Sequence, residues 1–514
     1  MPNSAAISAD TDPPSAASGR RPHAVIIGSG FGGLAAAVRL GARGYRVTVL
    51  EQLDAPGGRA YVFRQDGFTF DAGPTIITAP FLLEELWQLC NRRFADDVEL
   101  RALEPFYRIR FDDGFVLDCS GSDRVMAEQI ERFAPADQAG YERFMKISEA
   151  IYKVAFEQLS AEPFNAFTDM LKLAPDLVRL KSYHTVHSLV ASYVSDPRLR
   201  FALSFHPLFV GGNPFTTTSI YGLIAFLERR WGVHYAMGGT GSLVKGLVSL
   251  IEGQGNRLRY GARVAAITLA GQRATGVRLA TGEQLAADIV VSNADSATTY
   301  RNLVPSAARR RWTDRKTAAK QYSMSLFVWY FGTKRQYPEV PHHLILVGPR
   351  YREHLADIFA RKVLAEDFSL YLHRPTATDP SLAPPGCDAF YVLSPVPNLL
   401  GATDWTVHAE TYRRTIAAHL SATVLPGLED EVVSSRLMTP LDFRDRLSSF
   451  QGAAFGLEPI LTQSAWFRPH NRSEDIDGLF LVGAGTHPGA GVPGVISSAR
   501  VLDKVVPDAD TFIR

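Results

Sequence analysis

Four residues near the start of the chain have the types and spacing needed to hold a phosphate-bearing cofactor. Gly28, Gly30 and Gly33 occupy the three glycine positions of a GxGxxG motif, and Glu51 follows them. The first glycine allows a tight turn, the second lets the backbone approach a pyrophosphate, and the third lets a helix pack closely on a strand. The Glu51 carboxylate would accept hydrogen bonds from ribose hydroxyls, and its charge disfavours the 2′-phosphate of NADP. The pattern predicts a dinucleotide cofactor.

A strand, a helix and a second strand must position these residues, and the sequence supplies all three. Residues 23–30 contain a β-branched run typical of a buried strand, 31–44 carry small residues at helical spacing with Gly44 as a C-cap, and 45–51 predict the next strand. In such a βαβ unit the helix N-terminus offers free N–H groups to an anion. The motif alone does not separate NAD from FAD.

Two further glycine-rich segments favour FAD. Gly58 and Arg59 lie in a turn after Glu51, where backbone N–H groups and a guanidinium would bind phosphate oxygens. Residues 479–502 predict a strand, a Gly/Pro-rich loop and a helix beginning near Gly494, whose N-terminal partial charge would face the reducible edge of a flavin. Alternatively, each segment is an ordinary surface turn. Together the segments imply one cofactor domain built from both ends of the chain.

Length, charge and cysteine content set limits on the remaining interpretation. The 514 residues suggest about three domain-sized units. The 54 Lys and Arg nearly balance the 53 Asp and Glu, and no basic stripe occurs, so nucleic acid is not expected as a partner. Cys90, Cys119 and Cys387 are far apart and lack metal-ligand spacing, so we expect no disulfide, no metal site and a reducing, cytoplasmic setting.

Composition divides the chain into a tail and three units. Residues 1–22 are rich in Ser, Ala, Asp and Pro and are predicted to be disordered; the glycines after Arg20 and Arg21 argue against a twin-arginine export signal. The predicted class is α/β: a Rossmann-type FAD-binding domain, a mixed-sheet substrate domain and a helical, membrane-facing subdomain. The FAD-binding domain is predicted to comprise residues 23–85, 231–300 and 441–514. The substrate domain would comprise residues 86–121 and 301–440, and the helical subdomain residues 122–230.

The middle of the chain is apolar enough to hold an apolar substrate. Its helices between 122 and 230 either pack an ordinary core or form an access surface that lies in the headgroup region of a membrane. The predicted strands between 301 and 440 carry aromatic and aliphatic residues that would wall a tunnel over the flavin. No uninterrupted apolar run of about 18 residues occurs, so no membrane-spanning helix is expected.

Longer strings resemble the bacterial phytoene desaturase family of the flavin-containing amine oxidase superfamily. They include GFTFDAGPT at 67–75, SFHPLFVGGNPF at 204–215, LTQSAWFRPHN at 461–471 and LVGAGTHPGAGVPGV at 481–495. The resemblance extends from about His23 to Leu502 and implies FAD as the cofactor. The FAD contacts it implies are Gly28, Gly30, Gly32 and Gly33 at the pyrophosphate, Glu51 at the ribose, Gly58 and Arg59 at the phosphates, Gly73, Pro74 and Thr75 beside the isoalloxazine, Val264 near adenine, and Gly485, Gly494 and Val495 at the flavin end.

The resemblance also implies a substrate and a reaction. The substrate would be 15-cis-phytoene, a long hydrocarbon without polar groups, so its binding would come from burial of apolar surface. A hydride would pass to the flavin and a proton would leave the neighbouring carbon. Three rounds would give neurosporene and four lycopene, and oxygen or a quinone would reoxidise the flavin. An enzyme acting on such a substrate is expected in the cytoplasm, peripherally associated with the inner membrane.

The sequence contains three candidates for the acceptor of the proton. Asp169 lies in an apolar neighbourhood, where desolvation would raise the pKa of its carboxyl and suit it to act as a general base. Lys172 and Asp176, however, continue the pattern of a solvated helix face. His206 and His487 are alternatives, although an isolated histidine usually has a structural hydrogen-bonding role.

Two other functions fit parts of the pattern. One is an FAD oxidoreductase of the same superfamily that acts on another carotenoid or on an amine. The other is a non-catalytic escort protein that binds isoprenoids on the same fold. The intact phosphate motif favours an enzyme over an escort, and a yellow protein that bleaches on reduction would exclude the escort.

Overall fold

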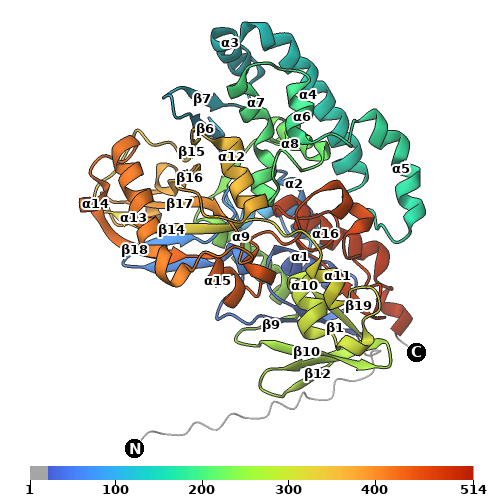
Figure 1. Cartoon of the computed structure of the whole chain (residues 1–514). Helices are drawn as coiled ribbons and strands as arrows, with labels where there is room; N and C mark the ends of the chain where they lie inside the picture. The colour runs from blue at the N-terminus through green and yellow to red at the C-terminus, as the bar shows by residue number, and fades with distance from the viewer. Residues whose placement is uncertain (1–20, 513–514) are drawn as a thin grey trace, which may run out of the picture.

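A five-stranded parallel sheet holds the predicted cofactor motif (Figure 1). The computed structural model describes residues 21–512. In spatial order the strands are β19 (Leu479–Leu481), β13 (Ile289–Ser292), β1 (His23–Ile27), β2 (Arg46–Leu50) and β9 (Arg257–Arg259). All four pairings are parallel. The sheet therefore combines strands from both ends and from the middle of the chain, as predicted for a Rossmann-type domain.

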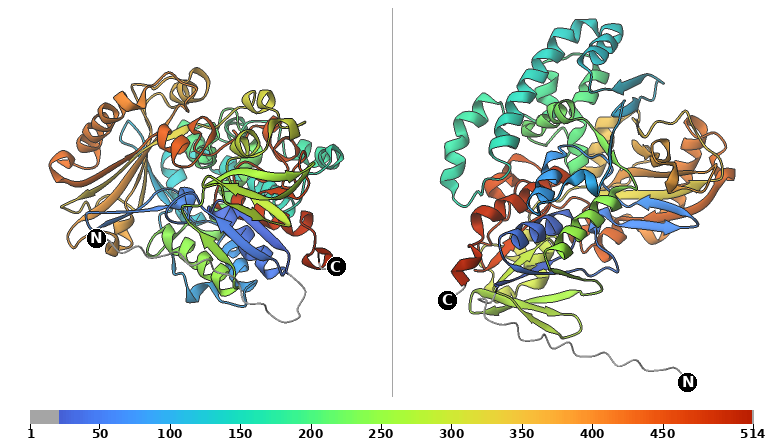
Figure 2. Two further views of the ribbon diagram at one scale, coloured as in Figure 1. Left: turned by 90° about the horizontal axis from the view of Figure 1, so that it is seen from below. Right: turned by 180° about the vertical axis from the view of Figure 1, so that it is seen from behind.

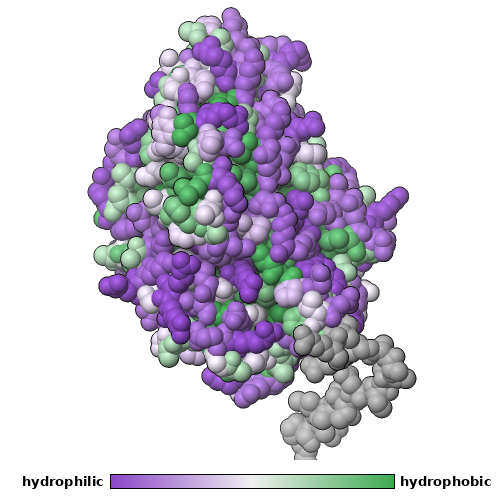
Figure 3. Space-filling view, turned by 90° about the vertical axis from the view of Figure 1, so that its right-hand side faces the viewer, coloured by the Kyte–Doolittle hydropathy of each residue, from purple (hydrophilic) through white to green (hydrophobic). Residues whose placement is uncertain are grey.

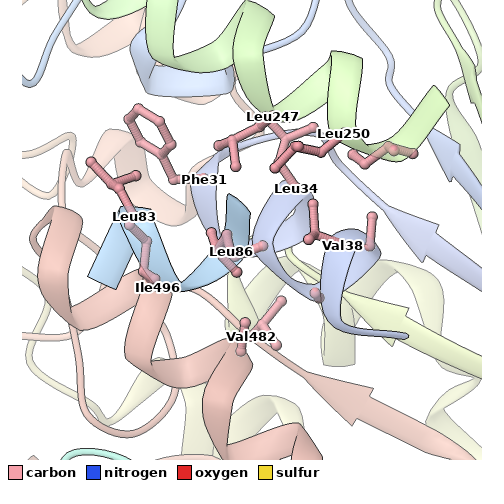
Figure 4. Packing of buried hydrophobic residues seen from close by; sticks show 14 of the residues in the cluster. Phe31, Leu34, Val38, Leu83, Leu86, Leu247, Leu250, Val482 and Ile496 are labelled. Carbon is pink, nitrogen blue, oxygen red and sulfur yellow. The ribbon is translucent and has the colours of Figure 1, made fainter. Parts of the chain in front are cut away.

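Helices from distant segments cover this sheet. α1 (Phe31–Ala42) packs against α9 (Thr240–Gly253) and α16 (Val492–Val505). Figure 4 shows Leu34 of α1 beside Leu247 and Leu250 of α9, with Ile496 of α16 in the same cluster. These side chains are buried because the small residues of α1 allow close approach of the neighbouring helices. Gly44, the predicted C-cap, follows the end of α1 with a φ of +88°.

A second, seven-stranded sheet lies to one side of the first (Figure 2). Its strands, in spatial order, are β18 (Val432–Met438), β14 (Ser325–Thr333), β17 (Asp388–Val396), β16 (Leu370–His373), β15 (His343–Leu346), β6 (Tyr107–Arg110) and β7 (Val116–Cys119). The pair β15–β6 is parallel and the other pairs are antiparallel. The sheet is thus mixed, in agreement with the prediction for the substrate domain.

Alternate residues of β14 face two different layers. Phe327 packs with α13 (Trp405–Thr423), whereas Tyr330 packs with the hairpin β3 (Val62–Gln65) and β4 (Phe68–Asp71). The predicted boundaries assign this hairpin to the FAD-binding unit, but its aromatic side chains lie against the second sheet. The hairpin therefore joins the two units, and the exact domain limits stay a prediction.

Most of residues 123–231 are helical and lie at the top of the molecule in Figure 1. This segment contains α3 (Asp123–Phe133), α4 (Gln138–Tyr152), α5 (Phe167–Arg179), α6 (Val186–Ala191), α7 (Pro197–Ser204) and α8 (Leu223–Trp231). Most of these helices share one apolar cluster, but α5 has no fully buried residue and stands at the edge of the molecule (Figure 1). Over residues 21–512, no helix combines the length and apolarity needed to cross a membrane.

Two smaller features complete the fold. β10 (Val264–Ala270), β11 (Arg273–Leu279) and β12 (Gln284–Ala286) form an antiparallel sheet beside the cofactor domain. Of the tail predicted to be disordered, residues 1–20 lie outside the described residues. Arg21 is described, and its Nη2 donates a hydrogen bond to the carbonyl oxygen of Tyr45 at 2.6 Å.

Candidate cofactor and substrate site

One cavity of about 850 Å³ lies between the two sheets and the helical segment. Its volume is in the range of sites that hold cofactors and other small molecules. The predicted site residues that line it are Gly28, Gly30, Gly32, Glu51, Gly58, Arg59, Gly73, Pro74, Thr75, Val264, Gly494 and Val495. Gly33, Gly485 and Asp169 do not line it. The structure thus brings most of the predicted FAD contacts to one place.

The glycine motif forms a tight cradle between β1 and α1. Gly28 has a φ of +89°, in the left-handed region that favours glycine. A Cβ on Gly33 would lie 2.1 Å from the carbonyl oxygen of Gly28, so only glycine lets α1 start this close to the strand. A Cβ on Gly30 would lie 2.9 Å from Asn293 Nδ2. This geometry places the N-terminus of α1 at the cavity and fits the pyrophosphate of a dinucleotide.

Glu51 is held at the edge of the cavity by its own hydrogen bonds. Its Oε2 accepts from the backbone N–H of Ser29 at 2.9 Å and from the Ser29 hydroxyl at 2.6 Å. Its Oε1 accepts from the backbone N–H of Leu53 at 2.9 Å. These donors fix an acid at the end of β2, where the ribose of a dinucleotide would lie.

Arg59 lines the cavity but is also anchored to the protein. Its Nε donates to the carbonyl oxygen of Ala454 at 2.6 Å, and its Nη2 donates to Ser449 Oγ at 2.9 Å. Burial lowers the pKa of the Arg59 guanidinium, and the nearby Asp295 carboxylate opposes this effect. Its Nη1 has no protein hydrogen bond among the described residues, and a role of Arg59 at the phosphates stays a prediction.

At the other end of the predicted cofactor, the start of α16 reaches the cavity. The helix follows Gly491, which has a φ of +94°, and residues 490–495 line the cavity. Thr75 lines it as well, with Oγ1 3.0 Å from the hydroxyl of Tyr371 and 2.8 Å from that of Tyr391. Gly485 instead packs on Ser296, since a Cβ there would lie 2.6 Å from Ser296 Oγ. Direct flavin contact by Gly485 stays a prediction.

Away from the cradle the cavity walls are mainly apolar. They come from the helical segment and from the second sheet, two units that the sequence assigns to substrate. The apolar lining residues include Phe156, Leu159, Phe164, Met170, Leu173, Leu177, Phe205, Phe209, Leu223, Leu227, Met324, Leu326, Val328, Ile345 and Leu393. A cofactor cradle and a hydrocarbon-compatible space are therefore parts of one continuous cavity.

The expectation that burial raises the pKa of the Asp169 carboxyl is wrong. Its Oδ2 accepts from the backbone N–H of Ala166 at 3.1 Å, and its Oδ1 lies 3.4 Å from Lys172 Nζ. The backbone N–H of Ala166 lowers the pKa of the carboxyl, and Lys172 lowers it further. Asp169 stays solvated because it sits in the first turn of α5, while Met170 and Leu173 face the cavity. A role as proton acceptor has no support from this geometry.

The two histidine alternatives have different surroundings. His487 lines the cavity with Nε2 2.9 Å from the carbonyl oxygen of Leu159, and burial lowers the pKa of its ring to about 4. His206 belongs to a buried cluster with Tyr107 and Glu228. Glu228 lines the cavity, and sequence reasoning missed it. Its one signal was a carboxylate in the apolar string LIAFLERRW.

The expectation of no metal site rests on the cysteines alone, and three histidines bear on it. His343 on β15, His373 on β16 and His342 directly before β15 are buried, with candidate ligand nitrogens within 4.8 Å of one another. The Nε2 atoms of His342 and His373 are 3.1 Å apart. Burial lowers the pKa of His342 to about 3 and keeps all three rings neutral, the form that binds metals. The absence of a metal stays a prediction.

Comparison with known proteins agrees with the geometry. The family profile described as flavin containing amine oxidoreductase matches residues 31–501. A neurosporene-forming phytoene desaturase of Cereibacter sphaeroides is 49% identical over 491 residues, which cover 95% of each chain. A lycopene-forming phytoene desaturase of Pantoea ananas is 49% identical over 479 residues, covering 92% of this chain and 97% of the relative.

Solved structures show the same fold at low sequence identity. A putrescine oxidase superposes with a TM-score of 0.65 at 13% identity, over 96% of this chain and 99% of the other. The cavity, the cradle and these likenesses lead to one conclusion. The chain belongs to the flavin-containing amine oxidoreductase family and, within it, to the bacterial-type phytoene desaturases.

Proposed function

We propose that the protein is an FAD-dependent desaturase that converts 15-cis-phytoene to neurosporene, lycopene or both in carotenoid biosynthesis. The observation that carries this proposal is the single cavity that joins the glycine cradle to apolar walls. Relatives that are 49% identical over nearly their whole length carry the names of neurosporene-forming and lycopene-forming phytoene desaturases.

The chain's own residues perform binding and positioning. The cradle between β1 and α1 holds FAD, which when bound accepts a hydride from the substrate. The apolar walls bind a hydrocarbon by burying its surface, which stabilises the complex by roughly 25 cal/mol per Å². The same walls exclude water from the reacting carbons, and the cavity shape sets which carbon lies next to the flavin. Repetition along both arms of the substrate requires three rounds for neurosporene and four for lycopene.

The proposed substrate partitions into membranes, and α5 offers a surface for contact with one. Phe167, Leu171 and Val178 of this helix are 50%, 58% and 66% exposed. Met170 and Leu173, on the same helix, line the cavity. Figure 3 shows hydrophobic patches within the mostly hydrophilic face on the right-hand side of Figure 1, where α5 lies. We propose that α5 docks on the cytoplasmic face of the inner membrane, where phytoene enters and a quinone, or oxygen, removes the electrons.

Expression in a cell that accumulates phytoene tests the proposal. We expect coloured products, whose absorption bands distinguish neurosporene from lycopene. The purified protein should be yellow and should bleach when reduced. A cell extract that retains only phytoene, despite FAD-loaded protein, would refute the desaturase function.

A further inference from the structure

Glu228 is a buried carboxylate in an apolar wall of the substrate cavity. It lies on α8 with 3% of its surface exposed, and its neighbours Leu223, Ile224 and Leu227 line the same cavity. Burial of a carboxylate in such surroundings is costly unless the group is compensated.

The partners of Glu228 are neutral or weakly basic groups. The hydroxyl of Tyr107 donates a hydrogen bond to Glu228 Oε2 at 2.9 Å. The Nε2 of His206 lies 3.3 Å from the same oxygen and 3.0 Å from the Tyr107 hydroxyl. Over residues 21–512, Oε1 has no protein hydrogen-bond partner. One carboxylate oxygen is thus held in place by two partners, and the residue itself lines the cavity.

No guanidinium neutralises this carboxylate within the described chain. Arg229, the next residue on α8, pairs with Asp123 and donates to the hydroxyl of Tyr141. Arg230 lies over the ring of Trp231, with Cζ 5.3 Å from the ring centroid. Neither arginine contacts Glu228, so no ion pair with a guanidinium occupies its carboxylate.

The cluster also lies close to the predicted flavin side of the cavity. The ring of Tyr107 packs edge-on against Phe205 and Phe209, at centroid distances of 5.3 and 6.3 Å, and both phenylalanines line the cavity. Ile76 packs against the same apolar cluster and lines the cavity. Ile76 directly follows Thr75, so the apolar cluster around Tyr107 includes the sequence neighbour of a predicted flavin contact, and Thr75, Ile76 and Glu228 all line the cavity.

We propose that Glu228 is the proton acceptor of the desaturation, a role that rests on the proposed function. In each round one carbon of the substrate loses a hydride to FAD, and the adjacent carbon loses a proton to a carboxylate oxygen of Glu228. The electrons of the second C–H bond become the new C=C bond. His206 and Tyr107 are positioning residues that hold Oε2. A quinone or oxygen then takes up two electrons and two protons, one proton from the reduced cofactor and one from Glu228, so both groups return to their starting states.

The test compares Glu228→Gln with the wild-type holoenzyme on phytoene in liposomes. The amide keeps the size of the side chain and can accept from Tyr107, but it cannot take up the proton. We expect kcat to fall at least 100-fold, since general base catalysis contributes about 10²–10⁴-fold. FAD content and KM should stay within threefold of wild type. Deuterium at the proton-losing carbon should slow Glu228→Gln more than wild type. Asp169→Asn, which removes a carboxylate outside the cavity, should retain wild-type kcat.

Each other outcome is decisive. A kcat for Glu228→Gln within threefold of wild type overturns the proposal while desaturation itself stands. A raised KM with unchanged kcat assigns Glu228 to substrate packing and also overturns it. Should the amide variant fail to hold FAD, Glu228→Asp decides: a rate reduced about tenfold or more supports the role, and a full rate overturns it. Wild-type protein that leaves phytoene unchanged refutes the proposed function and this inference together.

Discussion

Replacement of Gly33 by alanine tests whether close packing of α1 on the cradle is needed to hold FAD. The added methyl would lie 2.1 Å from the carbonyl oxygen of Gly28, and real Cβ contacts shorter than 3.0 Å essentially do not occur. The N-terminus of α1 must therefore shift by about 1 Å. Overpacking of this kind costs about 1–3 kcal/mol. Because the contact is with backbone, which cannot rotate away, we expect a cost of about 2–3 kcal/mol.

The same shift moves the N–H groups that would contact the pyrophosphate. If the cost appears in binding, the FAD affinity of Gly33→Ala falls about 30- to 150-fold, at roughly 1.4 kcal/mol per factor of ten. Titration of the apoprotein with FAD, followed by flavin fluorescence, measures it. Gly253→Ala is a matched control, because this helical glycine has nothing within 4 Å of the added Cβ. Wild-type FAD affinity and thermal stability in Gly33→Ala would refute the reasoning.

Three other predictions follow from the site. Burial lowers the pKa of His487 to about 4 in the folded protein, against about 6.5 in the unfolded chain, so the unfolded chain is protonated first as the pH falls. The free energy of unfolding that this group contributes is therefore complete above about pH 6.5. It falls by about 3 kcal/mol as the pH drops to 4. Urea unfolding of the apoprotein should show this loss, and His487→Asn should flatten it; an unchanged slope would contradict the assigned burial. Asp169→Asn should desaturate phytoene at the wild-type rate, and a tenfold loss would restore Asp169 as a candidate base. Exchange of Leu171 and Val178 for aspartate should weaken liposome binding about tenfold per residue, because each buries apolar surface in the proposed docked state; equal flotation of wild type and variant would exclude α5 as the contact.

Local patterns were sufficient for the cofactor unit. The β1–α1–β2 unit depends on neighbouring residues, so hydrophobic runs and glycine spacing predicted its elements and the close contact of Gly33 with the strand. The strand, glycine-rich loop and helix pattern of residues 479–502 predicted that this segment completes the same domain, which β19 and α16 do. The hydrogen bonds that anchor Arg59 to Ala454 and Ser449 could not be predicted from local patterns, because those partners lie almost 400 residues away.

At the substrate site the structure differs from the sequence-based prediction in two ways: it adds the cluster of Tyr107, His206 and Glu228, and it places Asp169 in a polar environment. Tyr107 is 99 residues from His206 and 121 residues from Glu228, so no spacing rule could have united them. Asp169 was expected in an apolar environment because apolar residues surround it in the sequence. On α5 those residues point in two directions, with Met170 lining the cavity and Leu171 exposed to solvent. Asp169, in the first turn, bonds to the backbone N–H of Ala166 and does not line the cavity. The spacing of apolar residues predicts such a helix, but it does not predict which of these residues pack inside the protein and which are exposed.

The strand order of the parallel sheet has a consequence for biosynthesis of the enzyme. β1 and β2 are made early, yet β13 gains its outer neighbour β19 and α1 gains α16 only after residues 479–505 have been translated. In a nascent chain the apolar surface of the β1–α1–β2 unit therefore stays partly uncovered for most of translation. Residues 490–495, which line the cavity, come from the same late segment, so the wall of the cofactor site is complete only after this segment has been made.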